Sequence, residues 1–128
     1  MGKIIGVLES VNYTTILSDE EHQIVVDEPL DLGGDNKGMT PMSLLASSLA
    51  SCTAITVQMY AKRKAWDIRK IEVEVTYQNN PETGKIEFIK HLALTGDIDA
   101  DQIKRLHLIA DKCPINKILK EGAQVTSA

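Results

Sequence analysis

The sequence contains two cysteines, Cys52 and Cys113, with sixty residues between them. They form no CxxC pair, and no set of His and Cys residues has the spacing of a zinc site. Cys52 lies in an uncharged, largely apolar run, residues 44–61, where a cysteine most often serves as a small core side chain. A thiol is also a nucleophile that oxidises reversibly, so both a structural and a reactive role remain open.

The two cysteines differ in the help that their local sequence offers to a negative charge. Cys113 precedes Pro114, a residue typical of the first position of a helix, and free N–H groups at a helix start stabilise a thiolate. Cys52 is expected about twelve residues inside a helix, where burial opposes the charged form. Arg63 is about 16 Å further along the same helix, so a cation near Cys52 must come from another segment or another subunit.

The N-terminal third predicts strands followed by one long helix. Residues 3–26 are rich in β-branched side chains and indicate two or three strands, with a hairpin turn near residues 18–21. The segment 30–41 holds three glycines and a proline and indicates a loop. Thr40 can cap the following helix, residues 41–64, which is nearly free of charge over most of its length and should be buried on most sides.

The remainder predicts a strand hairpin, two helices and a closing strand. Residues 68–78 and 86–98 are the expected hairpin, 99–113 and 114–119 the expected helices, and 123–127 the expected edge strand. Within the first of these helices, an inward stripe is expected to hold Ile103, Leu106, Ala110 and Cys113.

The expected fold is therefore a single α+β domain, residues 1–128, with N-terminal antiparallel strands, a long buried central helix, a two-stranded hairpin and a C-terminal helix pair. About a hundred other residues cannot easily cover a buried helix of this length. A second copy of the chain would supply the cover, which favours a homodimer with a large interface.

Composition excludes several classes of partner. The net charge is −4 and the pI is near 5.3, which argues against nucleic acid, and no basic run indicates a membrane surface. The N-terminus does not resemble a signal peptide, and the longest uncharged run is too rich in Ser and Thr for a membrane span. We expect a cytoplasmic protein with reduced thiols and with no metal or nucleotide cofactor, since no motif for either is present.

Two segments together resemble one known family. The run "GGDNKGMTPMSLLASSLASCTAITVQMYAKRKAW" and the later "DKCPINKIL" are similar to the paired motifs of the osmotically inducible protein C (OsmC) family, which includes organic hydroperoxide resistance proteins. The resemblance implies an intertwined homodimer with active sites at the subunit interface. It also implies that Cys52 attacks an organic hydroperoxide, that Cys113 resolves the resulting sulfenic acid as a disulfide, and that an external dithiol reduces it.

The chain departs from the family pattern at the residues that tune the thiol. Met42 stands where well-characterised members have Glu, and there is no Arg before Arg63, although those members use an Arg from the N-terminal strands. The candidate substitutes for the cation are Lys37, His22 and His107. The carboxylates that could replace the Glu are Glu28, Asp31 and Asp35. The candidates for an apolar substrate pocket are Met39, Met42 and Met59.

Three functions remain open at this point. The first is a cysteine-based peroxidase acting on organic hydroperoxides. The second is a non-enzymatic protein on the same dimeric fold that binds a small apolar molecule or senses redox state. The third is a redox-inert dimer with two core cysteines. The Cys pair favours the first function, and the missing Arg and Glu favour the second.

Overall fold

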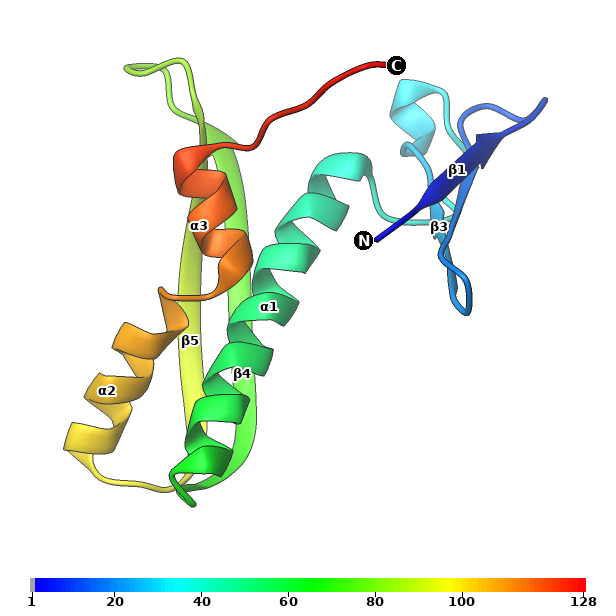
Figure 1. Ribbon diagram of the computed structural model, residues 1–128. Helices are drawn as coiled ribbons and strands as arrows, with labels where there is room; N and C mark the ends of the chain where they lie inside the picture. The colour runs from blue at the N-terminus through cyan, green and yellow to red at the C-terminus, as the bar shows by residue number, and fades with distance from the viewer. Residues whose placement is uncertain (1) are drawn as a thin grey trace. The chain divides into compact units, whose positions relative to one another are not determined.

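The computed structural model describes residues 2–128 and confirms a mixed α+β fold (Figure 1). The chain forms two compact units, Met1–Leu45 and Ala46–Ala128. The long helix α1, Pro41–Arg63, contributes its first turn to the first unit and the rest to the second. Its start agrees with the expectation, because the Thr40 hydroxyl accepts a hydrogen bond from the Ser43 N–H at 3.1 Å.

The first unit is a three-stranded antiparallel sheet with a loop that returns alongside it. The strands β1 (Ile5–Leu8), β2 (Thr15–Ser18) and β3 (Gln23–Val26) pair in the order β1-β2-β3, and the short 3₁₀ helix η1 spans Leu30–Leu32. Asp27 follows β3 and is buried. Its carboxylate accepts hydrogen bonds from the Thr14 hydroxyl and from the N–H groups of Glu28 and Lys37, which hold the loop in place.

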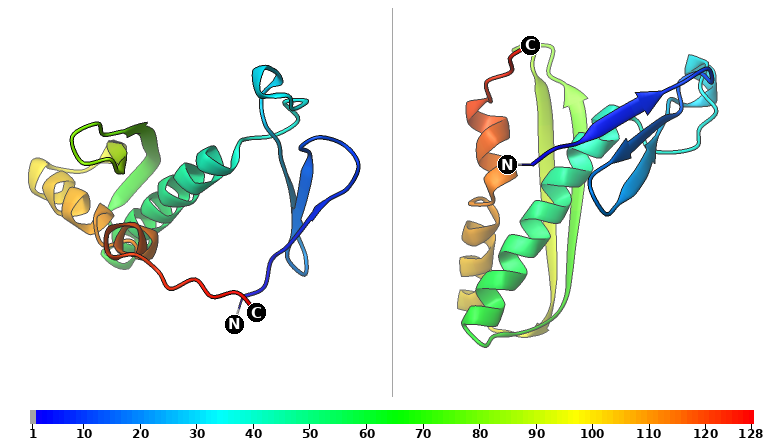
Figure 2. Two further views of the ribbon diagram at one scale, coloured as in Figure 1. Left: turned by 90° about the horizontal axis from the view of Figure 1, so that it is seen from above. Right: turned by 45° about the vertical axis from the view of Figure 1, so that its right-hand side comes forward.

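The second unit is a long hairpin with helices on one face (Figures 1 and 2). Strand β4 (Asp67–Asn79) pairs antiparallel with β5 (Ile86–Asp97), and the helices α2 (Ala100–Ala110) and α3 (Pro114–Glu121) follow. Its core joins α1 to α2 through the buried side chains of Val57, Ala61, Leu106 and Ala110. The hairpin covers this cluster with Ile68, Ile71, Leu92 and Leu94.

Burial of α1 follows one stripe rather than most of its surface. The buried positions are Ala46, Leu49, Thr53, Val57 and Ala61, spaced by three or four residues. On the other side, Ile55 is 54% and Met59 67% exposed in the single chain. By length and composition alone α1 could cross a membrane, but core helices meet the same criterion, and its buried stripe packs on α2 and the hairpin.

Two details of the sequence-based expectation are wrong. Residues 123–127 form no strand, because no neighbouring strand edge pairs with their backbone. Ile103 is 37% exposed, whereas Leu106, Ala110 and Cys113 are buried as expected. Ile103 lies in the first turn of α2, and the buried cluster that α2 joins begins only at Leu106.

Candidate functional site

Cys113 occupies the N-cap of α3 and is completely buried. Pro114 takes the first helical position, where its missing N–H costs nothing. The Asn116 N–H donates to the Cys113 Sγ at 3.3 Å, and the Asn116 side-chain amide donates to the Asp111 carbonyl at 3.2 Å. The turn between α2 and α3 is thus held in place on both sides of the sulfur.

The structure brings the two cysteines together. Cys52 lies near the middle of α1 and is half-buried, and it is close enough to Cys113 to help lower the pKa of that thiol. Neither cysteine forms a disulfide in the structure. Thr53, the next residue of α1, is buried, and its Oγ1 lies 3.5 Å from the Cys113 Sγ. Two helices that are far apart in the sequence therefore place both sulfurs at one point inside the second unit.

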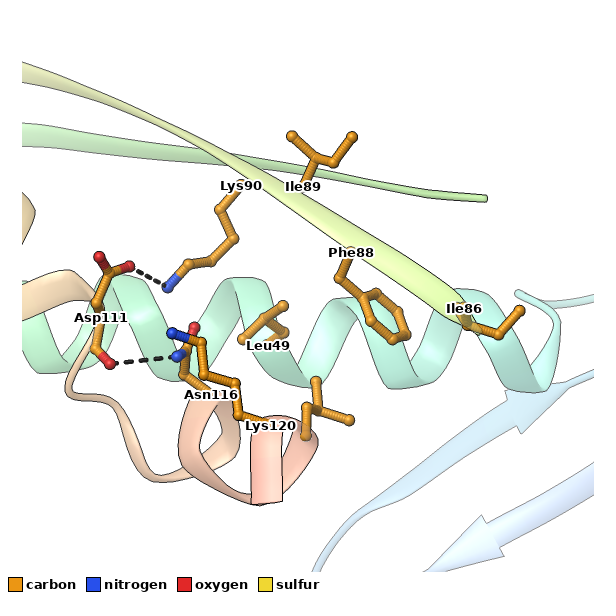
Figure 3. Close-up of a pocket in the computed structure, with 9 residues that line it drawn as sticks. Leu49, Ile86, Phe88, Ile89, Lys90, Asp111, Asn116 and Lys120 are labelled. Atoms are coloured by element: carbon orange, nitrogen blue, oxygen red, sulfur yellow. Dashed lines mark hydrogen bonds and ion pairs between the residues drawn. The ribbon is translucent and has the colours of Figure 1, made fainter. Parts of the chain in front are cut away.

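Lys90 on β5 joins this group from the hairpin. Its Nζ donates to the Thr53 Oγ1 at 3.3 Å and to the Ala110 carbonyl at 3.0 Å, and it forms an ion pair with Asp111 at 3.5 Å. Figure 3 shows the Lys90 side chain directed toward Asp111 and α1. A positive charge therefore lies one hydroxyl group away from the Cys113 sulfur.

The surroundings favour the thiolate form of Cys113. Burial is the strongest single influence on this thiol, and it opposes the charge. The hydrogen bonds with Thr53, the Asn116 N–H and Cys52, together with the charge of Lys90, outweigh it and hold the pKa of the Cys113 thiol below its usual value. The expectation that a helix start assists Cys113 agrees with this geometry.

A cavity of about 440 Å³ adjoins the same groups (Figure 3). Lys90, Asp111 and Asn116 lie in its wall and also take part in the contacts around Cys113. The rest of the wall is mostly apolar and consists of Leu49, Ile86, Phe88, Ile89, Leu119 and the polar Lys120. The cavity combines a largely apolar wall with one end formed by the Lys90–Asp111 ion pair, and neither cysteine is among its lining residues.

Two of the three substitute cations proposed from the sequence belong to the first unit and have partners there. His22 forms an exposed ion pair with Asp19 at 3.1 Å, and Lys37 donates its backbone N–H to Asp27, both within the first unit. His107 is exposed on α2. Of the proposed carboxylates, Glu28 is half-buried, and Asp31 and Asp35 are exposed in the loop after β3.

The proposed pocket residues do not line the cavity beside the thiols. Met42 lies in the first turn of α1 and is half-buried, and Met59 points away from the buried stripe of the same helix. Met39 is 53% exposed and bridges to β3 through its backbone. A role for these methionines in substrate binding stays a prediction.

Sequence reasoning missed Lys90 and Thr53, although a signal for Lys90 was present. Lys90 is in phase with Leu92 and Leu94, two and four residues later, and side chains of a strand at that spacing share a face. A lysine in phase with two core leucines must find partners inside the protein. Thr53 had no comparable signal, because small hydroxyl residues are frequent along α1.

Comparisons with known proteins agree with this fold. A family model described as OsmC-like protein matches residues 34–128, well over half of the chain. No sequence among curated proteins matches this chain.

Several solved structures are similar to this chain over most of their length. An OsmC-like protein from Mycoplasma pneumoniae has 24% identity and a TM-score of 0.77, with 98% of this chain and 96% of that one covered. An organic hydroperoxide resistance protein OsmC from Legionella pneumophila has 20% identity and a TM-score of 0.69, with 98% and 93% covered. The organic hydroperoxide resistance protein OhrB of Bacillus subtilis has 19% identity and a TM-score of 0.63, with 94% and 91% covered. At these identities the similarity shows the fold.

Proposed function

Because the chain belongs to the OsmC-like protein family, we propose that it is a cysteine-based peroxidase that reduces organic hydroperoxides with Cys52 and Cys113. The observation that carries the proposal is that two free cysteines, one on α1 and one at the N-cap of α3, lie close enough for Cys52 to help lower the pKa of Cys113. A core cysteine needs no second thiol beside it, whereas a thiol peroxidase that resolves its own sulfenic acid does. The names of the similar Legionella and Bacillus proteins indicate organic hydroperoxide resistance, in line with this chemistry.

The difference in exposure supports Cys52 as the residue of the first step. Cys52 is half-buried, whereas Cys113 is completely buried, so a peroxide meets Cys52 first. The Cys52 thiolate attacks the terminal peroxide oxygen, so that an S–O bond forms and the O–O bond breaks. The alkoxide leaves with the electron pair and takes up a proton to become an alcohol, and Cys52 is oxidised to a sulfenic acid.

The second step uses Cys113. Its sulfur attacks the sulfenic sulfur, an S–S bond forms, and the departing hydroxide takes up a proton to become water. An external dithiol then reduces the disulfide and restores both thiols. The influence of Cys52 on the pKa of Cys113 supports this exchange, because it requires the two thiols to be neighbours.

The cavity favours an organic substrate. Its wall carries Leu49, Phe88 and Leu119, which suit an alkyl or aryl group better than a small polar peroxide. Leu49 lies three residues before Cys52 on α1, so the two residues are neighbours on the helix surface. We therefore propose small organic hydroperoxides as the substrates, in preference to hydrogen peroxide.

The protein is proposed to act in the cytoplasm as an intertwined homodimer. The exposed Ile55 and Met59 on α1 favour a partner, because a large apolar side chain gains free energy when a second surface covers it.

Peroxide consumption with dithiothreitol as the reductant tests the function. We expect the protein to consume cumene hydroperoxide faster than hydrogen peroxide and Cys52→Ser to abolish turnover. Cys113→Ser should consume one equivalent of peroxide and leave a sulfenic acid that dimedone traps. Ser51→Ala, a neighbouring change on the exposed side of α1, is the matched control and should retain full activity.

Other results would replace the proposal. Normal turnover by Cys52→Ser would exclude the mechanism. Formation of the Cys52–Cys113 disulfide by peroxide without turnover would support a redox sensor, the second candidate, which the absence of an Arg before Arg63 favours. Neither turnover nor disulfide formation would indicate two structural cysteines.

A further inference from the structure

Lys90 occupies an unusual place for a lysine. On β5 it is in phase with Leu92 and Leu94, which pack on the core, and its pairing partner on β4 is Val75. Its side chain is only 14% exposed. An ammonium group that has lost most of its water needs protein acceptors in its place.

The ammonium group has two hydrogen-bond acceptors and one ion-pair partner. These are the Thr53 Oγ1 at 3.3 Å, the Ala110 carbonyl at 3.0 Å and the Asp111 Oδ1 at 3.5 Å. The acceptors belong to α1, α2 and the turn before α3. The position of the charge is therefore fixed by three elements at once.

Thr53 transmits this charge toward Cys113. Its oxygen accepts from Lys90, so the single hydroxyl hydrogen is available to the Cys113 Sγ at 3.5 Å. The Asn116 N–H at 3.3 Å also donates to that sulfur. A sulfur that accepts from two donors, with an ammonium group behind one of them, is stabilised as an anion.

We propose that Lys90 is a positioning residue that, acting through the Thr53 hydroxyl, stabilises the thiolate of Cys113 when Cys113 attacks the sulfenic acid of Cys52. In the peroxidase cycle, on which this role rests, Cys113 ionises as the resolving nucleophile once Cys52 has been oxidised. Lys90 therefore does not take the place of the Arg that is missing around Cys52. It acts on the sulfur of Cys113 instead.

The charge on Cys113 also sets the direction of reduction. An external thiolate attacks the Sγ of Cys52, the more exposed sulfur, and forms a mixed disulfide with it. The Cys52–Cys113 bond breaks, and its electron pair goes to Cys113, which leaves as the stabilised thiolate. A second external thiolate then attacks the sulfur of the bound reductant and releases Cys52. A better-stabilised leaving thiolate leaves faster, so the contacts that assist resolution also assist reduction.

The other ionisable groups around Cys113 are few. Cys52 faces it from α1, Lys90 from β5 and Asp111 from the turn before α3, and Asn116 on α3 is neutral. The Asp111 carboxylate is 65% exposed, so water screens its opposing charge more strongly than that of the buried ammonium group. The net field at Cys113 is therefore positive.

Thiolate absorbance against pH in the Cys52→Ser protein tests the proposal, because Cys113 is then the remaining thiol. We expect Lys90→Met to move the titration to higher pH and to leave about tenfold less thiolate at neutral pH. Thr53→Val should act in the same direction, whereas Lys90→Arg and Thr53→Ser should stay near the starting value. Lys112→Met removes the same charge beside Cys113 from an exposed position and is the matched control.

A second measurement follows resolution in the protein that retains both cysteines. After one equivalent of cumene hydroperoxide, Lys90→Met should accumulate dimedone-reactive sulfenic acid at Cys52, while Lys112→Met should close the disulfide at the normal rate. Unchanged titrations in both Lys90→Met and Thr53→Val would overturn the proposal, and so would equal shifts in Lys90→Met and Lys112→Met. The titration needs no peroxide, so failure of the peroxidase function would leave its result interpretable.

Discussion

Replacing Leu106 with alanine should destabilise the protein strongly. Leu106 is completely buried on α2 and packs with Val57, Ala61 and Ala110. The change removes three carbon atoms from that cluster, which accounts for about 2.5 kcal/mol of transfer free energy at about 0.8 kcal/mol per methylene group. Two of the three buried neighbours are alanines, whose side chains cannot extend into the space. A cavity therefore remains, and the total loss of unfolding free energy should be about 3 kcal/mol or more.

Urea unfolding followed by far-ultraviolet circular dichroism measures this loss. Leu108→Ala is the matched control, since it makes the same change on the same helix at a side chain that is 52% exposed. It should alter the free energy of unfolding by no more than about 0.5 kcal/mol. A loss below about 1 kcal/mol for Leu106→Ala, or equal losses for the two variants, would refute the packing described here.

Two further predictions concern a buried carboxylate and a helix cap. Burial alone would raise the pKa of Asp27, but hydrogen bonds, chiefly from the Glu28 N–H and the Thr14 hydroxyl, lower it overall. As the pH falls, the Asp27 carboxylate therefore takes up a proton in the unfolded chain before it does so in the folded one. The free energy of unfolding should then decrease as the pH drops below about 4. Urea unfolding across that range should show a smaller pH dependence for Asp27→Asn than for the unchanged protein. Asp99 and Gln102 form a reciprocal cap at the start of α2. In urea unfolding, Asp99→Ala should lower the free energy of unfolding by about 1 kcal/mol, and Asp99→Asn should lower it clearly less. Equal losses for the two variants would contradict the capping role.

Local signals predicted most of the elements. Thr40-Pro41 marked the start of α1, Asp99 marked the start of α2, and Cys113-Pro114 marked the start of α3, because helix termini have few chemical solutions for their free N–H groups. The prediction of a closing strand at residues 123–127 was wrong because strands, unlike helix starts, depend on distant segments. A strand needs a partner edge, and residues 123–127 carry only a suitable composition.

The candidate site was predicted in part. The resemblance to the OsmC family implied that Cys52 and Cys113 react with each other. It did not indicate Lys90 on β5, because the family pattern places the basic residue in the N-terminal strands. Strand phase with Leu92 and Leu94 would have identified Lys90 as inward-facing, but the identity of its acceptors depends on how α1 and α2 pack on the hairpin.

The sequence by itself determined the family, the order of the helices and strands, and the two thiols, since these depend on residue types at short spacing. Only the tertiary structure decided that Lys90, Thr53 and Cys113 form one hydrogen-bonded series. It also decided that the ammonium group of Lys90 acts on Cys113, whereas the sequence analysis looked for a cation near Cys52. The physical reason is that ionisation depends on distance and burial. Both quantities are set by packing between segments that the chain separates by tens of residues.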